Sequence, residues 1–323
     1  MAALLERLGV ELPIVQAGMG RGIARAELAA ATSEAGGLGT LGQMPPQALA
    51  NELAKARQAT RKPIAVNLLL PLARKRHWDV ARQADVVVTF WGRPKRRTEK
   101  PWLHQCGSVE EARAARAAGA DGVILQGVEA GGHVRGTTPA LDLLGAARKA
   151  LPDGYPLLLA GGIADSADVR EALDAGAEAA VLGTRFLMSD ESGARKAYKQ
   201  RLMESRETVL TELFGLGWPN APHRVIWNEA AERWLANDRR GPRWLHMANG
   251  VTGPVLSRLP GSLQDMAVKC QRANVPFLSP LPPADTAPSN LLDSGPLYAG
   301  ETVARIHDIR PAGELVRELA GVG

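Results

Sequence analysis

The sequence lacks the features of several protein classes. Only two of its 323 residues are cysteines, Cys106 and Cys270, which is too few for a disulfide scaffold or a cysteine-ligated structural zinc. No apolar run approaches the ~18–20 residues of a membrane-spanning helix. The chain also starts without an apolar signal segment. We therefore expect a soluble, cytoplasmic protein.

Strong net charge and the common catalytic spacings are lacking as well. The 39 Lys and Arg residues exceed the 34 Asp and Glu residues by only five, and the one basic run covers residues 93–97. There is no His-x-x-x-His or Cys-x-x-Cys spacing for a metal and no Gly-x-x-x-x-Gly-Lys-Ser/Thr loop for a nucleoside triphosphate. A serine nucleophile turn is also missing. Nucleic acid, a membrane and a metal are therefore not expected as partners.

Glycine is abundant instead, with 34 residues, and short apolar runs recur through the first 190 residues. Eight runs have the length of a strand, and most are continuously apolar, which is typical of parallel strands buried on both faces. The predicted strands are Pro13–Ala17, Gly37–Leu41, Pro63–Leu69, Asp85–Phe90, Trp102–Cys106, Gly122–Gln126, Pro156–Ala160 and Ala179–Leu182.

Helical stretches separate the predicted strands. Arg25–Ala35 and Pro45–Ala59 have helical length, and Ser108 opens a third helix with Glu111 three residues later, which is a capping-box pattern. A helix after Asp165 repeats the order of strand, loop, helix and glycine. Eight such units predict a (β/α)8 TIM barrel, with a doubly wound open sheet as the alternative.

The residues beyond the eighth strand have a different character. Residues 189–213 predict a long amphipathic helix, residues 275–300 are rich in Pro and Gly, and Thr302–Ala320 predicts a closing helix. The expected division is a barrel core over residues 1–190, a helical insertion or lid over 191–260, and a C-terminal loop and helix over 261–323.

The loops after the strands should carry the chemistry, because the strand C-termini form the active face of a TIM barrel. Strand 7 runs into Gly161-Gly162 and strand 8 into Gly183-Thr184. Backbone N–H groups and a hydroxyl can approach an anion there, so we predict a phosphate-bearing ligand. The alternative is that the two glycines after strand 7 only permit a tight turn.

Other strands end in polar or polarizable side chains. Unpaired amides at Asn67 and Gln126 would destabilise the fold, so we expect them to bond a heterocycle or the loop backbone. Met19 would lie against a flat ring or fill a core gap. His133 follows two glycines in the loop after strand 6, and an imidazole suits proton transfer near neutral pH. The alternative for His133 is a structural role.

Several segments together resemble the nitronate monooxygenase family, formerly called 2-nitropropane dioxygenases. The most specific is Glu129-Ala130-Gly131-Gly132-His133, and the likeness extends over nearly the whole chain. The other segments that carry it are residues 13–19, 66–68, 160–163, 182–186, 218–225 and 297–300.

The resemblance implies an FMN-dependent TIM barrel that oxidises nitroalkanes or alkyl nitronates with dioxygen to a carbonyl compound and nitrite. It implies that His133 is the catalytic base, which removes the proton α to the nitro group. It also implies that FMN is held by Gly18, Met19, Asn67, Gln126, Gly131, Gly162, Val181, Leu182, Gly183 and Thr184.

Three residues depart from the family pattern. Trp91 stands where many members have a histidine, Glu301 where glutamine is common, and Gly18 where proline is frequent. Trp91 would enlarge and flatten an apolar wall of the pocket, which favours a substrate other than a simple nitroalkane.

Two alternatives to a nitronate monooxygenase stay open. One is an FMN-dependent NAD(P)H reductase of the enoyl-acyl-carrier-protein or quinone type. Residues 93–97, placed beside the barrel mouth, would then contact an acidic carrier protein or a cofactor phosphate, although such a run is usually solvated surface. The other is a flavin-binding or phosphate-binding barrel without turnover.

Overall fold

The structure is a computed structural model that describes residues 4–256 and 261–322. The chain forms two compact units, each with its own core. The barrel unit comprises Met1–Ala130, Arg135–Gly193 and Asp308–Gly323, and the second unit comprises Gly131–Val134 and Ala194–His307. Four residues of the loop after the sixth barrel strand therefore belong to the second unit.

The barrel unit contains an eight-stranded parallel sheet that closes on itself. The strands follow one another in space in chain order, and a bridge between Val15 and Leu38 joins the first strand to the second. The predicted TIM barrel is therefore confirmed. Its strands are β1 (Ile14–Gln16), β2 (Gly39–Leu41), β3 (Ile64–Leu69), β4 (Val86–Phe90), β5 (Trp102–Cys106), β6 (Gly122–Gln126), β8 (Leu157–Ala160) and β9 (Ala179–Leu182).

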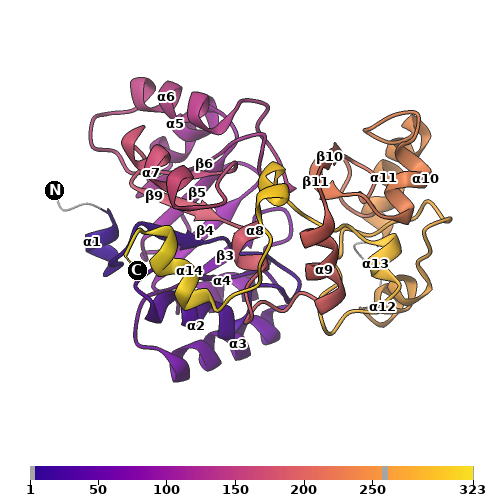
Figure 1. The fold of residues 1–323 in the computed structure, drawn as a ribbon, viewed down its shortest axis with the longest axis horizontal. Helices are drawn as coiled ribbons and strands as arrows, with labels where there is room; N and C mark the ends of the chain where they lie inside the picture. Colours follow the sequence, from indigo (N-terminus) through magenta and orange to yellow (C-terminus); the bar gives the residue numbers. More distant parts are fainter. Residues whose placement is uncertain (1–3, 257–260, 323) are drawn as a thin grey trace. The chain divides into compact units, whose positions relative to one another are not determined.

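Helices pack around this barrel, and their caps follow the sequence pattern. Ser108 Oγ accepts a hydrogen bond from Glu111 N at 3.2 Å, and Asp165 closes a capping box with Asp168. The C-terminal α14 (Ala312–Leu319) packs against α2 (Ala26–Glu34) and α7 (Ser166–Asp174) (Figure 1). The other helices of this unit are α1 (Leu4–Leu8), α3 (Pro46–Ala59), α4 (Lys75–Ala81), α5 (Val109–Ala117), α6 (Ala140–Ala150) and α8 (Thr184–Leu187).

Residues 91–101, all of which the structure describes, contain no helix between β4 and β5. This segment is fixed along the barrel wall by its basic side chains. Arg96 bonds the carbonyl of Gly119 and lies 3.2 Å from Asp121, at the end of the barrel where β6 begins. Arg97 lies 5.6 Å from the ring of Trp78 on α4. The expectation that the whole basic run lies beside the barrel mouth is therefore wrong, because Arg96 is bound at the opposite end.

The sheet separates two sets of buried apolar side chains. One set takes alternate residues from most strands, such as Val15, Ala65 and Ile124, and fills the barrel interior. The other takes the intervening residues, such as Val66 and Leu125, and packs against the helices. Because side chains alternate along a strand, Thr40, Asn67, Gln105 and Gln126 face the interior near the C-terminal ends of their strands.

The second unit is built on a three-stranded antiparallel sheet of order β10-β11-β7. A cluster that includes Val209, Phe214, Val225 and Leu245 forms its core. Its elements are β7 (Gly132–His133), α9 (Lys196–Glu204), β10 (Thr208–Thr211), β11 (His223–Ile226), α10 (Glu229–Leu235), α11 (Arg243–Leu256), α12 (Gly261–Cys270), α13 (Leu291–Ser294) and a 3-10 helix over Glu301–Arg305.

Two predicted helices are wrong in extent. The helix predicted over residues 189–213 covers only Lys196–Glu204, because Thr208–Thr211 alternates in burial and pairs with β11 as a strand. The closing helix predicted over Thr302–Ala320 is divided, and Pro311 starts its second part. Within the described residues, no helix combines the length and the apolar character needed to cross a membrane.

Candidate active site

Two neighbouring barrel strands are followed by glycines, and two of these, Gly162 and Gly183, stand where a Cβ would fit without a clash. Gly161 and Gly162, after β8, have φ values of 105° and 75°, which other residues rarely adopt. A Cβ on Gly162 would come no closer than 3.9 Å to Glu129, and one on Gly183, after β9, no closer than 3.9 Å to Ala17. Because β8 and β9 pair, the two stretches of backbone adjoin at the barrel mouth. This is the predicted phosphate position.

The ends of β1, β2 and β3 pack closely around two oxygens that lack partners. Asn67 Nδ2 donates to the carbonyl of Gly18 at 3.0 Å, which turns Asn67 Oδ1 away from it. Neither Asn67 Oδ1 nor Thr40 Oγ1 has a hydrogen-bond partner among the described residues, although both are buried. A buried polar atom without a partner destabilises a fold, so these oxygens mark a place for a ligand.

The same packing explains why glycine stands at position 18. A Cβ there would lie 2.4 Å from the Cβ of Asn67 and 3.0 Å from Thr40 Cγ2. A proline at this position would bring the same Cβ, so Asn67 as placed here requires glycine.

Thr40 and Gln105 are site candidates that sequence reasoning missed. Both face the barrel interior, and Thr40 is 1% exposed. Threonine is common in strands, so Thr40 in the run Gly39-Thr40-Leu41 gives no signal of its own. The signal lies in its position instead. Thr40 belongs to the layer of interior side chains nearest the C-terminal ends of the strands, and the other layers of the interior are apolar.

Gln126 and Arg135 link the loop after β6 to the rims of β4 and β5. Gln126 Oε1 accepts from the backbone N–H of Arg135 at 3.2 Å, so one of its bonds goes to the loop backbone. The Arg135 guanidinium lies 4.8 Å from the ring of Trp91 and bonds Glu111, with Nε 2.7 Å from Oε1. Trp91 has a φ of 63°, a left-handed conformation rare for a bulky residue. The residue that departs from the family pattern is thus fixed at the rim.

The other predicted site residues of the barrel unit lie in different layers of the barrel. Val181 faces the barrel interior, whereas Leu182 packs in the layer between sheet and helices. The carbonyl of Leu182 accepts from Ala17 N at 2.9 Å, which ties β9 to the loop after β1. Met19 is partly buried against the helix layer, as a residue that fills a core gap would be.

His133 lies in the second unit, among three other rings. Its imidazole stacks on Trp218 with ring centroids 4.2 Å apart and planes 24° apart. The centroids of His223 and Tyr298 are 5.4 Å and 5.6 Å away. Burial, and then the neighbouring His223, lower the pKa of His133 well below its ordinary value. The imidazole is therefore in its neutral form at pH 7.

His223 cannot take the same role. Its Nδ1 lies 2.9 Å from the carbonyl of Ala221, and its Nε2 accepts from Phe214 N–H at 3.2 Å. These bonds assign the neutral tautomer with the proton on Nδ1. Burial lowers the pKa of His223 to about 4, so it stays neutral over the range in which an enzyme works.

The second unit also contains Gly131, a predicted cofactor residue, and Glu301, which departs from the family pattern. A Cβ on Gly131 would lie 2.5 Å from the backbone nitrogen of Gly300, so glycine is required for close packing there. Glu301 Oε1 lies 2.8 Å from Nη2 of Arg224, a 6% exposed residue on β11. The carboxylate that departs from the family pattern thus pairs with a buried cation.

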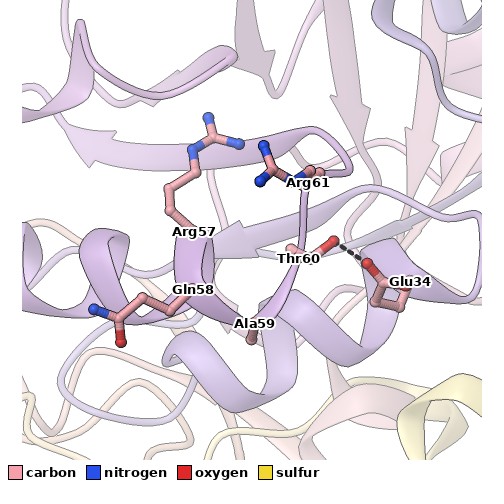
Figure 2. A pocket seen from close by; sticks show the side chains of 6 residues that line it. All are labelled: Glu34, Arg57, Gln58, Ala59, Thr60 and Arg61. Carbon is pink, nitrogen blue, oxygen red and sulfur yellow. Dashed lines mark hydrogen bonds between the residues drawn. The ribbon is translucent and has the colours of Figure 1, made fainter.

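One surface hollow of the barrel unit, of about 450 Å³, lies away from these residues. Figure 2 shows Arg57 and Gln58 at the end of α3, with Thr60 bonded to Glu34 across the hollow. These residues precede β3, so they lie at the N-terminal end of the barrel strands, where residues usually serve stability. Over residues 4–256 and 261–322, no group of three or more His, Cys, Asp or Glu side chains could hold a metal ion.

Comparisons with known proteins agree on the type of protein. The model of the family described as nitronate monooxygenase matches residues 2–94 and 93–321. The chain is 32% identical over 289 residues to a nitronate monooxygenase of Pseudomonas aeruginosa, covering 69% of this chain and 80% of that protein.

Two other similar proteins carry different names. The chain is 33% identical over 250 residues to a Mycobacterium tuberculosis protein, covering 73% of this chain and 69% of that protein. That protein is a (3aS,4S,5R,7aS)-5-hydroxy-7a-methyl-1-oxo-octahydro-1H-indene-4-carboxyl-CoA dehydrogenase. The structure of FabK from Thermotoga maritima matches with a TM-score of 0.78 at 26% identity, covering 99% of this chain and 94% of that one.

Proposed function

The chain belongs to the nitronate monooxygenase family, and from that premise we propose that it is an FMN-dependent oxidoreductase. Its substrates would be alkyl nitronates or nitroalkanes, which it oxidises with dioxygen to a carbonyl compound and nitrite. The observation that carries the proposal is the match of the family model across residues 2–321, which includes the segment around His133.

The barrel residues fit FMN in two respects. The backbone at Gly162 and Gly183, where a Cβ would fit without a clash, can approach a phosphate, and we propose that Val181, Leu182 and Thr184 complete this region. The partnerless oxygens of Thr40 and Asn67 can bond the polar edge of a heterocycle, beside Gly18 and Met19. Gln126 and Gly131 complete the residues that we propose for the cofactor. The bound flavin would supply the electron-transfer chemistry.

His133 is the proposed base. Its neutral imidazole would accept the proton α to the nitro group, so that the C–H bond breaks and the negative charge moves onto the nitro oxygens. A base that is neutral at the working pH is the form general base catalysis needs. The rings of Trp218 and Tyr298 also pack against His133.

The test is an absorbance spectrum of the purified protein, followed by aerobic assays with a nitroalkane and with its preformed nitronate. We expect flavin absorbance, and nitrite released from both substrates. A protein that retains flavin but releases no nitrite from either substrate would refute the proposed reaction.

The similarity to the Mycobacterium tuberculosis CoA dehydrogenase favours a second candidate. In this reading the protein is a flavin-dependent dehydrogenase or NAD(P)H reductase that acts on a thioester or a quinone. Anaerobic mixing separates the two candidates, since rapid bleaching of the flavin by NADH or NADPH would favour the reductase.

A further inference from the structure

We propose that Trp218 is a positioning residue for His133, whose stacked indole ring fixes the plane of the imidazole and so the direction from which it accepts the substrate proton. The proposal rests on the proposed function, in which His133 is the base. Neither the sequence pattern nor the comparisons assign a role to Trp218.

The backbone of His133 is already fixed by pairing. In the antiparallel ladder of β7 and β11, His133 stands opposite His223 and Gly132 opposite Arg224. The next residue, Val134, donates its N–H to the carbonyl of Pro222 at 2.8 Å. What pairing leaves undetermined is the rotation of the imidazole about its side-chain bonds.

The indole of Trp218 removes that freedom. With centroids 4.2 Å apart and planes only 24° apart, the two rings are in face-to-face contact. The lone pair of an imidazole nitrogen lies in the plane of the imidazole ring. Because that plane is held nearly parallel to the indole, the nitrogen can accept a proton only from a direction roughly parallel to the indole plane. The substrate C–H bond must therefore approach in that plane.

The other two rings near His133, those of Tyr298 and His223, make hydrogen bonds to the backbone. The Tyr298 hydroxyl donates to the carbonyl of Pro280 at 3.0 Å, and its own carbonyl accepts from the Tyr198 hydroxyl at 2.7 Å. Both nitrogens of His223 are bonded to backbone. Neither ring is available to relay a proton. Their contribution to His133 is therefore packing against its imidazole.

The test compares Trp218→Ala and Trp218→Phe on a neutral nitroalkane and on its preformed nitronate. Aromatic stacking contributes a modest free energy, so kcat on the nitroalkane should fall roughly two- to tenfold in Trp218→Ala, with KM nearly unchanged. The isotope effect of α-deuteration should rise, because proton removal becomes slower. Trp218→Phe should restore most of the rate, and turnover of the nitronate, which needs no proton removal, should stay unchanged.

Trp244→Ala is the matched control. This tryptophan lies in the same unit, is 51% exposed and contacts the ring of Trp234 edge-on. It should leave both rates unchanged. An equal loss on nitroalkane and nitronate in Trp218→Ala, or no loss on either, would overturn the proposal.

A failure of the proposed function can be told apart from a failure of this inference. If the wild type turns over neither substrate, the reaction is wrong, and the positioning role is then judged by nuclear magnetic resonance. With labelled histidine, assigned by means of His133→Asn, Trp218→Ala should shift the ring signals of His133 strongly because the indole ring current is lost. Unshifted His133 signals would refute the stacking itself.

Discussion

The two units of the molecule place their polar groups in different ways. In the barrel unit, Asn67 and Gln126 stand at the ends of regular strands, and the pairing of parallel strands brings such positions together. In the second unit, His133 pairs with His223, ninety positions further along the chain. Its ring neighbours also come from remote segments.

This difference suggests a division of tasks. The barrel unit offers backbone and amide groups, which suit a cofactor with a phosphate and a heterocycle. The second unit offers a neutral imidazole held among rings, which suits proton transfer. Cofactor retention and proton removal should therefore be lost through different substitutions.

The largest effect is expected from His133→Asn. Loss of a general base typically lowers a rate by about 10²–10⁴-fold, so turnover of a neutral nitroalkane should fall in that range. Turnover of the preformed nitronate should fall far less, and the flavin absorbance should stay. Steady-state nitrite assays on both substrates measure the first two, and a spectrum measures the third. Equal activity on both substrates would remove the base role from His133.

Gly162→Ala is the barrel counterpart of that substitution. An alanine at a φ of 75° is strained by about 1–2 kcal/mol, so the loop should relax away from its present form. We expect flavin affinity to fall about tenfold, while flavin-saturated protein keeps its preference between the two substrates. Titration with FMN checks the affinity. If His133→Asn also released the flavin, the two tasks would not be divided between the units as argued.

Acid should destabilise both units through buried histidines, of which one in each unit is considered first. Burial lowers the pKa of His104 in the barrel unit, and of His223 in the second unit, to about 4. Because these pKa values lie below the unfolded value of about 6.5, the stabilisation is complete above pH 6.5 and is lost as the pH falls towards 4. Each histidine should account for about 3 kcal/mol.

Hydrogen exchange at several pH values can assign this loss to a unit. His223→Gln should flatten the pH dependence of protection for the amides of β10 and β11, and His104→Gln that of β4 and β5. A single variant that flattened both would show that the units do not respond to acid separately.

The barrel was largely predictable because its signals are local. Each strand is a short apolar run, and Asp165 and Ser108 open helices with caps that need only their own first turn. All eight predicted strands are present within one or two residues of their predicted ends. Gly161 and Gly162, after strand 7, also signalled the positive φ values found there.

The second unit was less predictable because its structure depends on remote partners. Thr208–Thr211 becomes a strand only through its pairing with β11, so a helical pattern read from residues 189–213 ran past the true end at Glu204. The surroundings of His133 could not be predicted for the same reason. Its stacking partner, Trp218, is 85 positions away in the sequence.

Two helix caps, Asp165 in the barrel unit and Asn228 in the second unit, allow a smaller comparison. It sets the stability gained from hydrogen bonds within one helix against that gained from hydrogen bonds to remote segments. Asp165 caps α7 by accepting from Ala167 N at 3.0 Å and from Asp168 N at 3.2 Å, both in the first turn of its own helix. Asn228 caps α10 and also donates to the carbonyls of Leu292 and Gly295, and it is 4% exposed.

Asp165→Ala should therefore cost about 1 kcal/mol, the usual effect of a lost N-cap. Asn228→Ala should cost roughly 2–4 kcal/mol, because it also removes the donor to the buried carbonyl of Gly295 and one of the two donors to the carbonyl of Leu292. Urea denaturation followed by hydrogen exchange in each unit measures both. Equal costs would mean that the remote bonds of Asn228 add nothing to its cap.

The smallest expected effect is the change in stability caused by Thr40→Val. Whether this substitution stabilises or destabilises the flavin-free protein shows whether the Thr40 hydroxyl is part of the core or a place for the cofactor. The buried hydroxyl of Thr40 has no partner among the described residues, whereas the Thr32 hydroxyl, also buried in the barrel unit, donates to the carbonyl of Leu28 at 2.9 Å. Without flavin, Thr32→Val should cost about 1 kcal/mol, but Thr40→Val should be neutral or stabilise the protein by a similar amount.

With flavin the order of the two variants should reverse. If Thr40 bonds the cofactor, Thr40→Val should weaken FMN binding by about fivefold, the loss of one modest hydrogen bond. Thr32→Val should leave the affinity unchanged. Urea denaturation of the flavin-free protein and titration with FMN give the two quantities. A Thr40→Val protein that is less stable without flavin and binds FMN normally would make this hydroxyl an ordinary part of the barrel core, and the oxygen of Asn67 would then be the cofactor contact at this edge.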